Sequence, residues 1–236
     1  MKSIREGTKW AVFSPEQSPP MHFYLDLMRQ YEGTDKLPDW KEERARKFID
    51  AHFFYVFPKD NAPTPHYIRE VFYDLHQREK IDGCVIDPFN QLANDWAKNK
   101  RDDQYLDSFL SDHKRFGMDL NLYNVIIAHP KGMQLIDGEY PCPRVYDFAG
   151  GAMWNNKCDN ILQYHRPNYQ QDPSDPTCQF VSQKIKKQRA NGIPGTVEME
   201  YDRDAFRFLI NGRNPLNEDQ EPTIKPNYEA MEDAPF

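Results

Sequence analysis

Acidic side chains follow two short apolar segments, and both are placed where a metal could bind or water be activated. Residues 81–88 (IDGCVIDP) end in Asp87 before a proline, and residues 11–16 (AVFSPE) end in Glu16. If both segments are parallel strands, both acids lie at the carboxyl edge of a sheet, where α/β proteins bind ligands. Asp87 would then hold Mg²⁺ on a nucleotide, and Glu16 would polarise an attacking water. Taken alone, each acid also fits a simpler role, Asp87 as the cap of a turn and Glu16 as a surface acid.

A histidine ends a third apolar segment, residues 124–130 (NVIIAHP), and Lys131 follows it. At the end of a buried strand, His129 can donate a hydrogen bond to a phosphate and so sense its presence. The alternative is a histidine with a purely structural role, whose hydrogen bonds are satisfied within the protein at the end of the strand.

Basic residues and glycines mark two later segments. Residues 184–197 (KIKKQRANGIPGTV) place Lys187 and Arg189 two apart, so on extended backbone both cations point the same way and suit a terminal phosphate. A solvated basic edge strand with a hairpin is the alternative. The paired glycines Gly150 and Gly151 allow either a close backbone approach to a ligand or a plain turn.

The elements that must position these residues alternate in type over the first 130 residues. This alternation predicts βα units and a mostly parallel sheet flanked by helices, while the closely spaced later strands predict antiparallel pairing. Thr64 is the expected cap of one helix and Gly33 the stop of another. We expect helices over 21–31, 41–52, 65–80 and 105–116, and strands over 10–13, 53–57, 83–87, 122–129, 160–164, 181–187, 196–201 and 206–210.

Composition limits the classes of function. The 236 residues carry a net charge of −7, which disfavours a protein that coats a duplex through a globally basic face. The four cysteines form no C-x-x-C pair, so reduced thiols in a cytoplasmic protein are expected. No apolar stretch is long enough for a membrane span, and none resembles a secretory signal. The sequence contains no G-x-x-x-x-G-K-[ST], G-x-G-x-x-G, G-x-S-x-G or H-E-x-x-H motif.

Taken in order, five segments resemble the C-terminal RecA-fold motor domain of replicative ring helicases. The resemblance is to the DnaB/Twinkle group, especially phage-type primase-helicases with toprim domains, and it covers roughly residues 7–210. It implies an α/β RecA-like P-loop NTPase core, a mostly parallel sheet with antiparallel strands at the C-terminal end. The segments are AVFSPE (11–16), GCVIDPFNQL (83–92), NVIIAHPKG (124–132), YDFAGGAMWNNKCDNILQYHRP (146–167) and KIKKQRANGIPGTVEMEYD (184–202).

The resemblance assigns a role to each candidate residue at the nucleotide. Glu16 matches the glutamate that activates water, and Asp87 matches the Walker B aspartate that holds Mg²⁺ on ATP. His129 matches the sensor at the end of the next strand. Lys187 and Arg189 match the K-x-R pair that reaches the γ-phosphate of a neighbouring subunit, the arginine-finger role.

The resemblance also implies partners. Single-stranded DNA is expected to pass through a hexameric ring and to touch Lys131, the glycine pair Gly150 and Gly151, and a segment that begins at Asn90 and ends at Arg101.

One departure from the family concerns the P-loop. In the family, a first strand and a Walker A motif precede the strand with the glutamate, and this sequence holds neither. We therefore expect residues 1–216 to be a partial motor domain, with little or no ATP turnover alone and apolar surface exposed at the incomplete sheet. A non-catalytic RecA-like module that binds DNA or a partner and supplies finger residues in trans is the alternative. An unrelated enzyme with His129 and Asp87 as an acid–base pair is a more distant one.

The last twenty residues form an acidic tail. Residues 217–236 contain six acids, one lysine and three prolines, and we expect this segment to be disordered. It ends in Pro235-Phe236, which resembles the tail tip of bacterial single-stranded-DNA-binding proteins and predicts a replisome partner. A tail that only improves solubility is the alternative.

Overall fold

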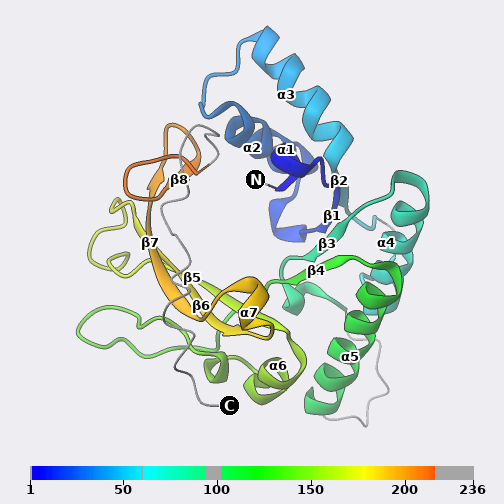
Figure 1. Ribbon diagram of the computed structural model, residues 1–236, viewed down its shortest axis with the longest axis vertical. Coiled ribbons are helices and arrows are strands. Elements are labelled where there is room, and N and C mark those ends of the chain that lie inside the picture. The colour runs from blue at the N-terminus through cyan, green and yellow to red at the C-terminus, as the bar shows by residue number, and fades with distance from the viewer. Residues whose placement is uncertain (1, 60, 94–101, 216–236) are drawn as a thin grey trace.

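The computed structural model describes residues 2–59, 61–93 and 102–215, which form two four-stranded sheets with helices around them. Figure 1 shows the parallel sheet of β1–β4 and the antiparallel sheet of β5–β8 on opposite sides of the view, with α1 and α2 near the top. In the part of the chain that is described, no helix is long and apolar enough to cross a membrane.

The parallel sheet consists of four short strands in the order β2-β1-β3-β4. In register, Phe13 lies opposite both Val56 and Ile86, and Ile86 lies opposite Ile126. The carboxyl ends of the strands therefore meet at one edge, where the segments that follow them come together. The strands are β1 (Trp10–Phe13), β2 (Phe53–Val56), β3 (Gly83–Ile86) and β4 (Tyr123–Ile126).

Helices α4 (Pro65–Glu79) and α5 (Asp102–Leu120) pack on the parallel sheet from its outer side (Figure 1). Phe72 of α4 and Phe109 of α5 join the buried cluster with Phe13 and Ile86. The Thr64 hydroxyl caps α4 by accepting a hydrogen bond from the Tyr67 amide, as its position predicts. A second, smaller core lies between α2 (Pro20–Glu32) and α3 (Asp39–His52). The short α1 (Lys2–Glu6) precedes β1.

The antiparallel sheet follows in the chain, in the order β5-β6-β7-β8. Helix α6 (Gly151–Lys157) leads into it and contacts α5, and α7 (Gln188–Asn191) connects β6 to β7. The strands are β5 (Asn160–His165), β6 (Thr177–Ile185), β7 (Gly195–Asp202) and β8 (Arg207–Leu209).

The fold class predicted from the sequence is confirmed, since the structure has a parallel sheet flanked by helices and a separate antiparallel sheet. Several boundaries differ, three of them at candidate site residues. Strand β4 ends at Ile126 rather than at His129, β6 runs over Thr177–Ile185 rather than 181–187, and the glycine pair opens a helix rather than a loop. Residues 217–236, predicted to be a disordered tail, lie outside the described residues.

Strand β4 forms one edge of the parallel sheet. Among the described strands it pairs only with β3, and the side chains of Val125 and Ile127 are about two-fifths exposed, at 39% and 40%. Strands of parallel sheets are usually covered on both faces. Strand β4 therefore presents apolar side chains at the edge of the sheet, and the incomplete sheet stays a prediction.

Candidate nucleotide site

The structure places Asp87 directly beside the segment that carries Glu16. The buried Ser14 hydroxyl donates a hydrogen bond of 3.0 Å to the Asp87 carboxylate oxygen Oδ2, and the Asp87 amide donates one of 2.8 Å to the Phe13 carbonyl. The serine and the aspartate are 73 positions apart in the chain and meet because β1 and β3 are neighbouring strands. The carboxylate is therefore held at the carboxyl edge of the sheet.

Tyr55 fixes the same segment from the other side. Its hydroxyl donates a hydrogen bond of 2.6 Å to the Ser14 carbonyl, and its amide donates one of 3.2 Å to the Tyr24 hydroxyl. Burial raises the pKa of Tyr55, so the phenol keeps the proton that it donates. The motifs in the sequence pointed to neither Ser14 nor Tyr55. A serine directly after an apolar strand is the only sign that the sequence offers.

Glu16 lies in the short 3-10 helix η1 (Pro15–Gln17) that starts just after β1, and its side chain is exposed. It is three residues beyond Phe13, at the same edge as Asp87. The geometry leaves this carboxylate open to solvent, as a group that contacts a water molecule must be.

His129 lies three residues beyond the end of β4 and is exposed. The chain continues along the sheet past Ile126, since the Ile127 amide donates to the Ile86 carbonyl (2.9 Å). The Phe89 amide donates to the Ile127 carbonyl (2.8 Å) and ties the helix η2 (Phe89–Gln91), which contains Asn90, to the same place. Glu16, Asp87 and His129 therefore follow three adjacent strands at one edge. Of the predicted channel segment 90–101, residues 94–101 lie outside the described residues.

The sequence predicts that Lys187 and Arg189 lie on extended backbone and point the same way, but the structure places them differently. Strand β6 ends at Ile185, Lys187 is the cap of α7, and Arg189 lies within that helix. The prediction of backbone direction is wrong because the strand ends two residues before Lys187 and a helix begins directly after it. Both side chains are exposed, and among the described residues neither has a hydrogen bond or ion pair to the edge that carries Asp87.

Gly150 and Gly151 pack within the chain. Gly150 has a left-handed φ of +70° and caps α6, and a Cβ at this position would lie 2.4 Å from the Leu106 Cδ2 atom. A Cβ on Gly151 would lie 2.4 Å from the Val145 carbonyl oxygen. These contacts explain the glycine pair by packing, and contact with DNA stays a prediction.

The residues at the edge fit a nucleotide-bound Mg²⁺ better than a metal held by protein alone. Within the described residues, no three His, Cys, Asp or Glu side chains lie close enough together to hold a metal ion. Mg²⁺ commonly uses one or two carboxylates and takes its other ligands from water and phosphate. Asp87, oriented by the Ser14 hydroxyl, provides one such carboxylate.

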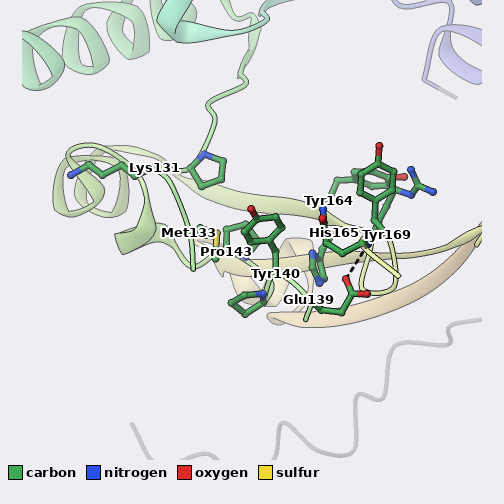
Figure 2. A pocket seen from close by; sticks show the side chains of 12 residues that line it. Lys131, Met133, Glu139, Tyr140, Pro143, Tyr164, His165 and Tyr169 are labelled. Atoms are coloured by element: carbon green, nitrogen blue, oxygen red, sulfur yellow. Dashed lines mark hydrogen bonds between the residues drawn. The ribbon is translucent and has the colours of Figure 1, made fainter. Parts of the chain in front are cut away.

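A hollow of about 420 Å³ lies between the segment after His129 and the end of β5 (Figure 2). Three tyrosines, Tyr140, Tyr164 and Tyr169, line it together with Lys131 and Arg166. The backbone of Lys131 is held in place by a hydrogen bond of 2.9 Å from its amide to the Asp147 carbonyl. The sequence alone does not reveal this hollow, because its walls come from separate segments.

Comparison with known proteins gives a relative in sequence. The chain is 28% identical over 164 residues to the chloroplastic/mitochondrial Twinkle homologue of Arabidopsis thaliana. The match covers 69% of this chain and 23% of that protein, so the chain spans about a quarter of the relative's length. A scan of protein-family models finds no match.

Solved structures share the fold. A DnaB-like replicative helicase, solved in a study of its interactions with primase, matches with a TM-score of 0.62 at 16% identity, over 86% of this chain and 52% of that one. A solved ATPase domain matches with a TM-score of 0.63 at 15% identity, over 86% and 75% of the two chains. The RadB recombinase matches with a TM-score of 0.50 at 14% identity, over 84% and 78%.

Sequence and fold thus agree: the chain resembles the RecA-fold motor domain of DnaB/Twinkle-type helicases, as its motifs predicted.

Proposed function

We propose that this chain is the catalytic part of an ATP-driven motor that moves along single-stranded DNA, as a partial RecA-like domain over residues 1–216. The observation that supports the proposal is that Glu16, Asp87 and His129 follow three adjacent parallel strands at the same edge of the sheet. In open α/β sheets, ligands bind at this edge. The similarity to a Twinkle homologue supports the same assignment.

Asp87 and its supports prepare the site for ATP. The Ser14 hydroxyl orients the Asp87 carboxylate, and Tyr55 holds Ser14 through its carbonyl. Mg²⁺ bound by Asp87 would neutralise charge on the phosphates of the nucleotide. The serine and tyrosine contacts keep the carboxylate in one orientation before ATP arrives, which lowers the cost of organising the site.

Glu16 and His129 act on the γ-phosphate side of the nucleotide. The exposed Glu16 carboxylate accepts a hydrogen bond from the attacking water and takes its proton as the water adds to phosphorus. The His129 imidazole donates a hydrogen bond to the γ-phosphate and reports its loss to the segment that contains Lys131. Phosphoryl transfer depends mainly on such positioning and on stabilisation of charge.

Lys187 and Arg189 act on the nucleotide of a neighbouring subunit in a hexameric ring. Their side chains are exposed, and among the described residues neither has a hydrogen bond or ion pair to the chain's own Asp87 edge. An arginine supplied in trans stabilises the charge that develops on the transferred phosphoryl group. Within the ring, Asn90, Lys131, Gly150 and Gly151 contact the DNA, mainly at its phosphates, so binding weakens as salt rises.

The chain alone is proposed to lack turnover, because its 236 residues contain no Walker A motif. Without that loop, the β- and γ-phosphates lack the backbone amides and the lysine that normally cradle them.

ATP hydrolysis, measured with and without single-stranded DNA, tests the proposal on two proteins: this chain and a version extended upstream through any P-loop in the reading frame. We expect turnover only from the extended protein, with Glu16→Gln abolishing it. The Arg189→Ala protein should regain activity when mixed with Glu16→Gln subunits, because each supplies what the other lacks. Hydrolysis by the 236-residue chain alone would contradict the proposed need for a P-loop.

A non-catalytic module is the second candidate, and the exposed Lys187–Arg189 turn favours it for the isolated chain. Such a module would bind DNA or complete a ring with P-loop-bearing subunits, and would supply only its finger residues. If the extended protein also fails to hydrolyse ATP, and this chain stimulates a P-loop-bearing partner through Arg189, the second candidate replaces the first.

A further inference from the structure

The hollow between the segment after His129 and the end of β5 has the lining of a peptide-binding groove. We call it the tyrosine hollow, after Tyr140, Tyr164 and Tyr169. In Figure 2 Tyr140 lies nearer to Lys131 than Tyr164 and Tyr169 do, and the Lys131 side chain points away from the three tyrosines. Its remaining apolar lining is formed by Pro130, Met133, Pro141 and Pro143. Grooves lined by aromatic residues bind extended, proline-containing segments.

The charges on the rim of the tyrosine hollow favour an acidic ligand. Lys131 and Arg166 have no ion pair with any other described residue. The Arg166 guanidinium lies 4.4 Å from the centroid of the Tyr169 ring and donates only to carbonyl oxygens, those of Pro173 and Asp175. Hydrogen bonds from Thr177 and Asn168 lower the pKa of the Asp175 carboxyl, and Arg166 adds to this shift, so the charge of Arg166 is partly offset without an ion pair.

The other two titratable side chains of the hollow do not offset these cations fully. The Glu139 carboxylate accepts hydrogen bonds from the amides of Gln170 and Gln171, at 3.2 and 3.0 Å, so its oxygens are already used to hold the loop. Burial lowers the pKa of His165, although Glu139 opposes the shift, so the neutral ring is favoured. Among the residues that line the hollow there are thus one acid and two cations, Arg166 beside Tyr169 and Lys131 at the opposite end.

We propose that the acidic segment 217–236 of this chain docks in the tyrosine hollow. The segment contains six acids against one lysine, which complements Lys131 and Arg166. It also contains three prolines and the apolar residues Ile224, Tyr228, Met231 and Phe236, which match the aromatic and proline-rich lining. Apolar burial supplies most of the affinity, and the charges guide the orientation of the segment.

The length of the segment allows docking in the same molecule. Twenty residues in extended form span roughly 65 Å. A domain of this size has a radius of gyration of about 17 Å. The segment therefore reaches the hollow from any point on the surface where residue 215 lies. Because the segment is attached, a contact that is weak for a separate peptide is populated within one chain.

Docking makes the segment a competitor of single-stranded DNA. Lys131, a proposed DNA contact, lies in the wall of the tyrosine hollow. When the acidic segment occupies the hollow, its charge repels phosphates from this surface. The structure thus points to an autoinhibitory contact that DNA must displace. This inference stands apart from ATP turnover, because it requires no nucleotide.

Fluorescence anisotropy of a labelled peptide of residues 217–236 tests the proposal on the full chain. In a tail-silenced chain, with Tyr228→Ser, Met231→Ser and Phe236→Ser, the hollow is free. We expect this chain to bind the peptide at least tenfold more tightly than the wild-type chain, whose own segment competes. Adding Lys131→Glu to the tail-silenced chain should weaken binding at least tenfold, whereas Lys47→Glu, an exposed lysine on α3, should not change it.

Three results would overturn the proposal. The first is equal peptide binding by the wild-type and tail-silenced chains, and the second is equal binding by the Lys131→Glu and Lys47→Glu proteins. The third concerns a tail-silenced chain that does not bind the peptide. If this chain binds oligothymidine saturably, and Tyr140→Ser weakens that binding, the hollow is assigned to DNA. Each readout is independent of hydrolysis, so failure here and failure of the proposed motor function are told apart.

Discussion

In the parallel sheet, Glu16 and Asp87 follow strands that lie in the core, whereas in the antiparallel sheet the Lys187–Arg189 turn follows a strand with a half-exposed face. On β1 the side chain of Phe13 is 1% exposed, but on β6 the side chain of Phe180 is 39% exposed. Phe180 lies opposite Tyr164, which is also half-exposed. The two regions therefore hold their functional residues by different means.

Backbone register does most of the positioning in the parallel sheet. Asp87 is held by its amide bond to the Phe13 carbonyl and by the Ser14 hydroxyl, both set by the pairing of β1 and β3. The antiparallel sheet is joined to α5 by apolar packing of Trp154 and Ile161 and also by surface charges, since Lys114 of α5 and Lys186 both contact the Asp159 carboxylate. The difference teaches that the Asp87 edge is a rigid part of the core, while the place of the Lys187–Arg189 turn depends on surface charge.

The largest expected effect is a loss of stability on removing a phenylalanine ring, which should differ between the two sheets. Phe13→Ala removes a buried ring and should lower the free energy of unfolding by about 3–5 kcal/mol. Phe180→Ala is the matched change on the antiparallel sheet and should cost below about 1 kcal/mol, since its ring is already partly hydrated. Urea denaturation measures both. Equal losses would show that the antiparallel sheet is as much part of the core as the parallel one.

A pH dependence sharpens the comparison at α5, which packs on the parallel sheet and also contacts α6, the helix that leads into the antiparallel sheet. His113 is buried between Phe109 and Phe116, and both ring nitrogens lack a hydrogen-bond partner in the described residues. Burial, with a smaller effect of Arg69, lowers its pKa from 6.5 to about 4. The folded state therefore favours the neutral ring.

The sign of the effect follows from linkage. Between pH 6.5 and pH 4 the unfolded chain binds a proton at His113 and the folded chain does not, so stability falls as the pH falls. The full stability is present above pH 6.5, and the loss over the window is roughly 3 kcal/mol. The His113→Phe protein keeps the ring stack and should lack this part of the pH dependence of stability. Urea titrations at about pH 7.5 and about pH 4.5 measure it, because these values span most of the pH range over which the stability changes. An unchanged slope would mean that His113 is protonated in the folded chain.

Much of the parallel sheet could be predicted from the sequence, because its strands are apolar runs between clear helix signals. The strand expected over 53–57 is present as Phe53–Val56, and Thr64 caps α4 as expected. The meeting of Ser14 with Asp87 could not be predicted, because residues 73 positions apart become neighbours only when β1 pairs with β3. Spacing along the chain says which residues end strands, and strand order decides which of them meet.

The antiparallel region shows where a local pattern has two physical outcomes. Paired glycines predict a flexible turn, but Gly151 instead lies against the Val145 carbonyl and starts α6. The spacing of Lys187 and Arg189 predicts a shared direction only on extended backbone, and the chain is helical there. In both segments a tertiary contact or a turn that the sequence does not mark decides the geometry.

The Gly151→Ala substitution tests whether the glycine pair is needed for packing within the chain or for contact with DNA. The new Cβ would lie 2.4 Å from the Val145 carbonyl oxygen, and the required shift should cost about 1–3 kcal/mol of stability. Gly195→Ala is the control, because a Cβ there meets nothing within 4 Å and no loss is expected. Denaturation gives the stabilities, and filter binding gives the affinity for oligothymidine. Weaker DNA binding by a Gly151→Ala protein of unchanged stability would favour direct contact with DNA over packing.

The smallest expected effect concerns the tie between the two regions. Asp159→Asn removes the carboxylate that Lys114 and Lys186 contact at 2.5 and 2.8 Å. Because the carboxylate is about half exposed, each ion pair is worth only about 0.2–1 kcal/mol, so the stability should fall by about 1 kcal/mol or less. Asp112→Asn, which loses a long and exposed contact to Arg115 on α5, is the matched control.

The more telling readout of the Asp159→Asn change is the susceptibility of the β6–α7 turn to proteolysis at rising salt. In the wild-type chain, cleavage after Lys187 should increase with salt as the ion pairs are screened, and in the Asp159→Asn chain it should be high at all salt concentrations. If the turn in both proteins is cleaved at the same rate whatever the salt, then β-sheet pairing rather than surface charge positions the Lys187–Arg189 turn, and the two sheets hold their functional residues in the same way.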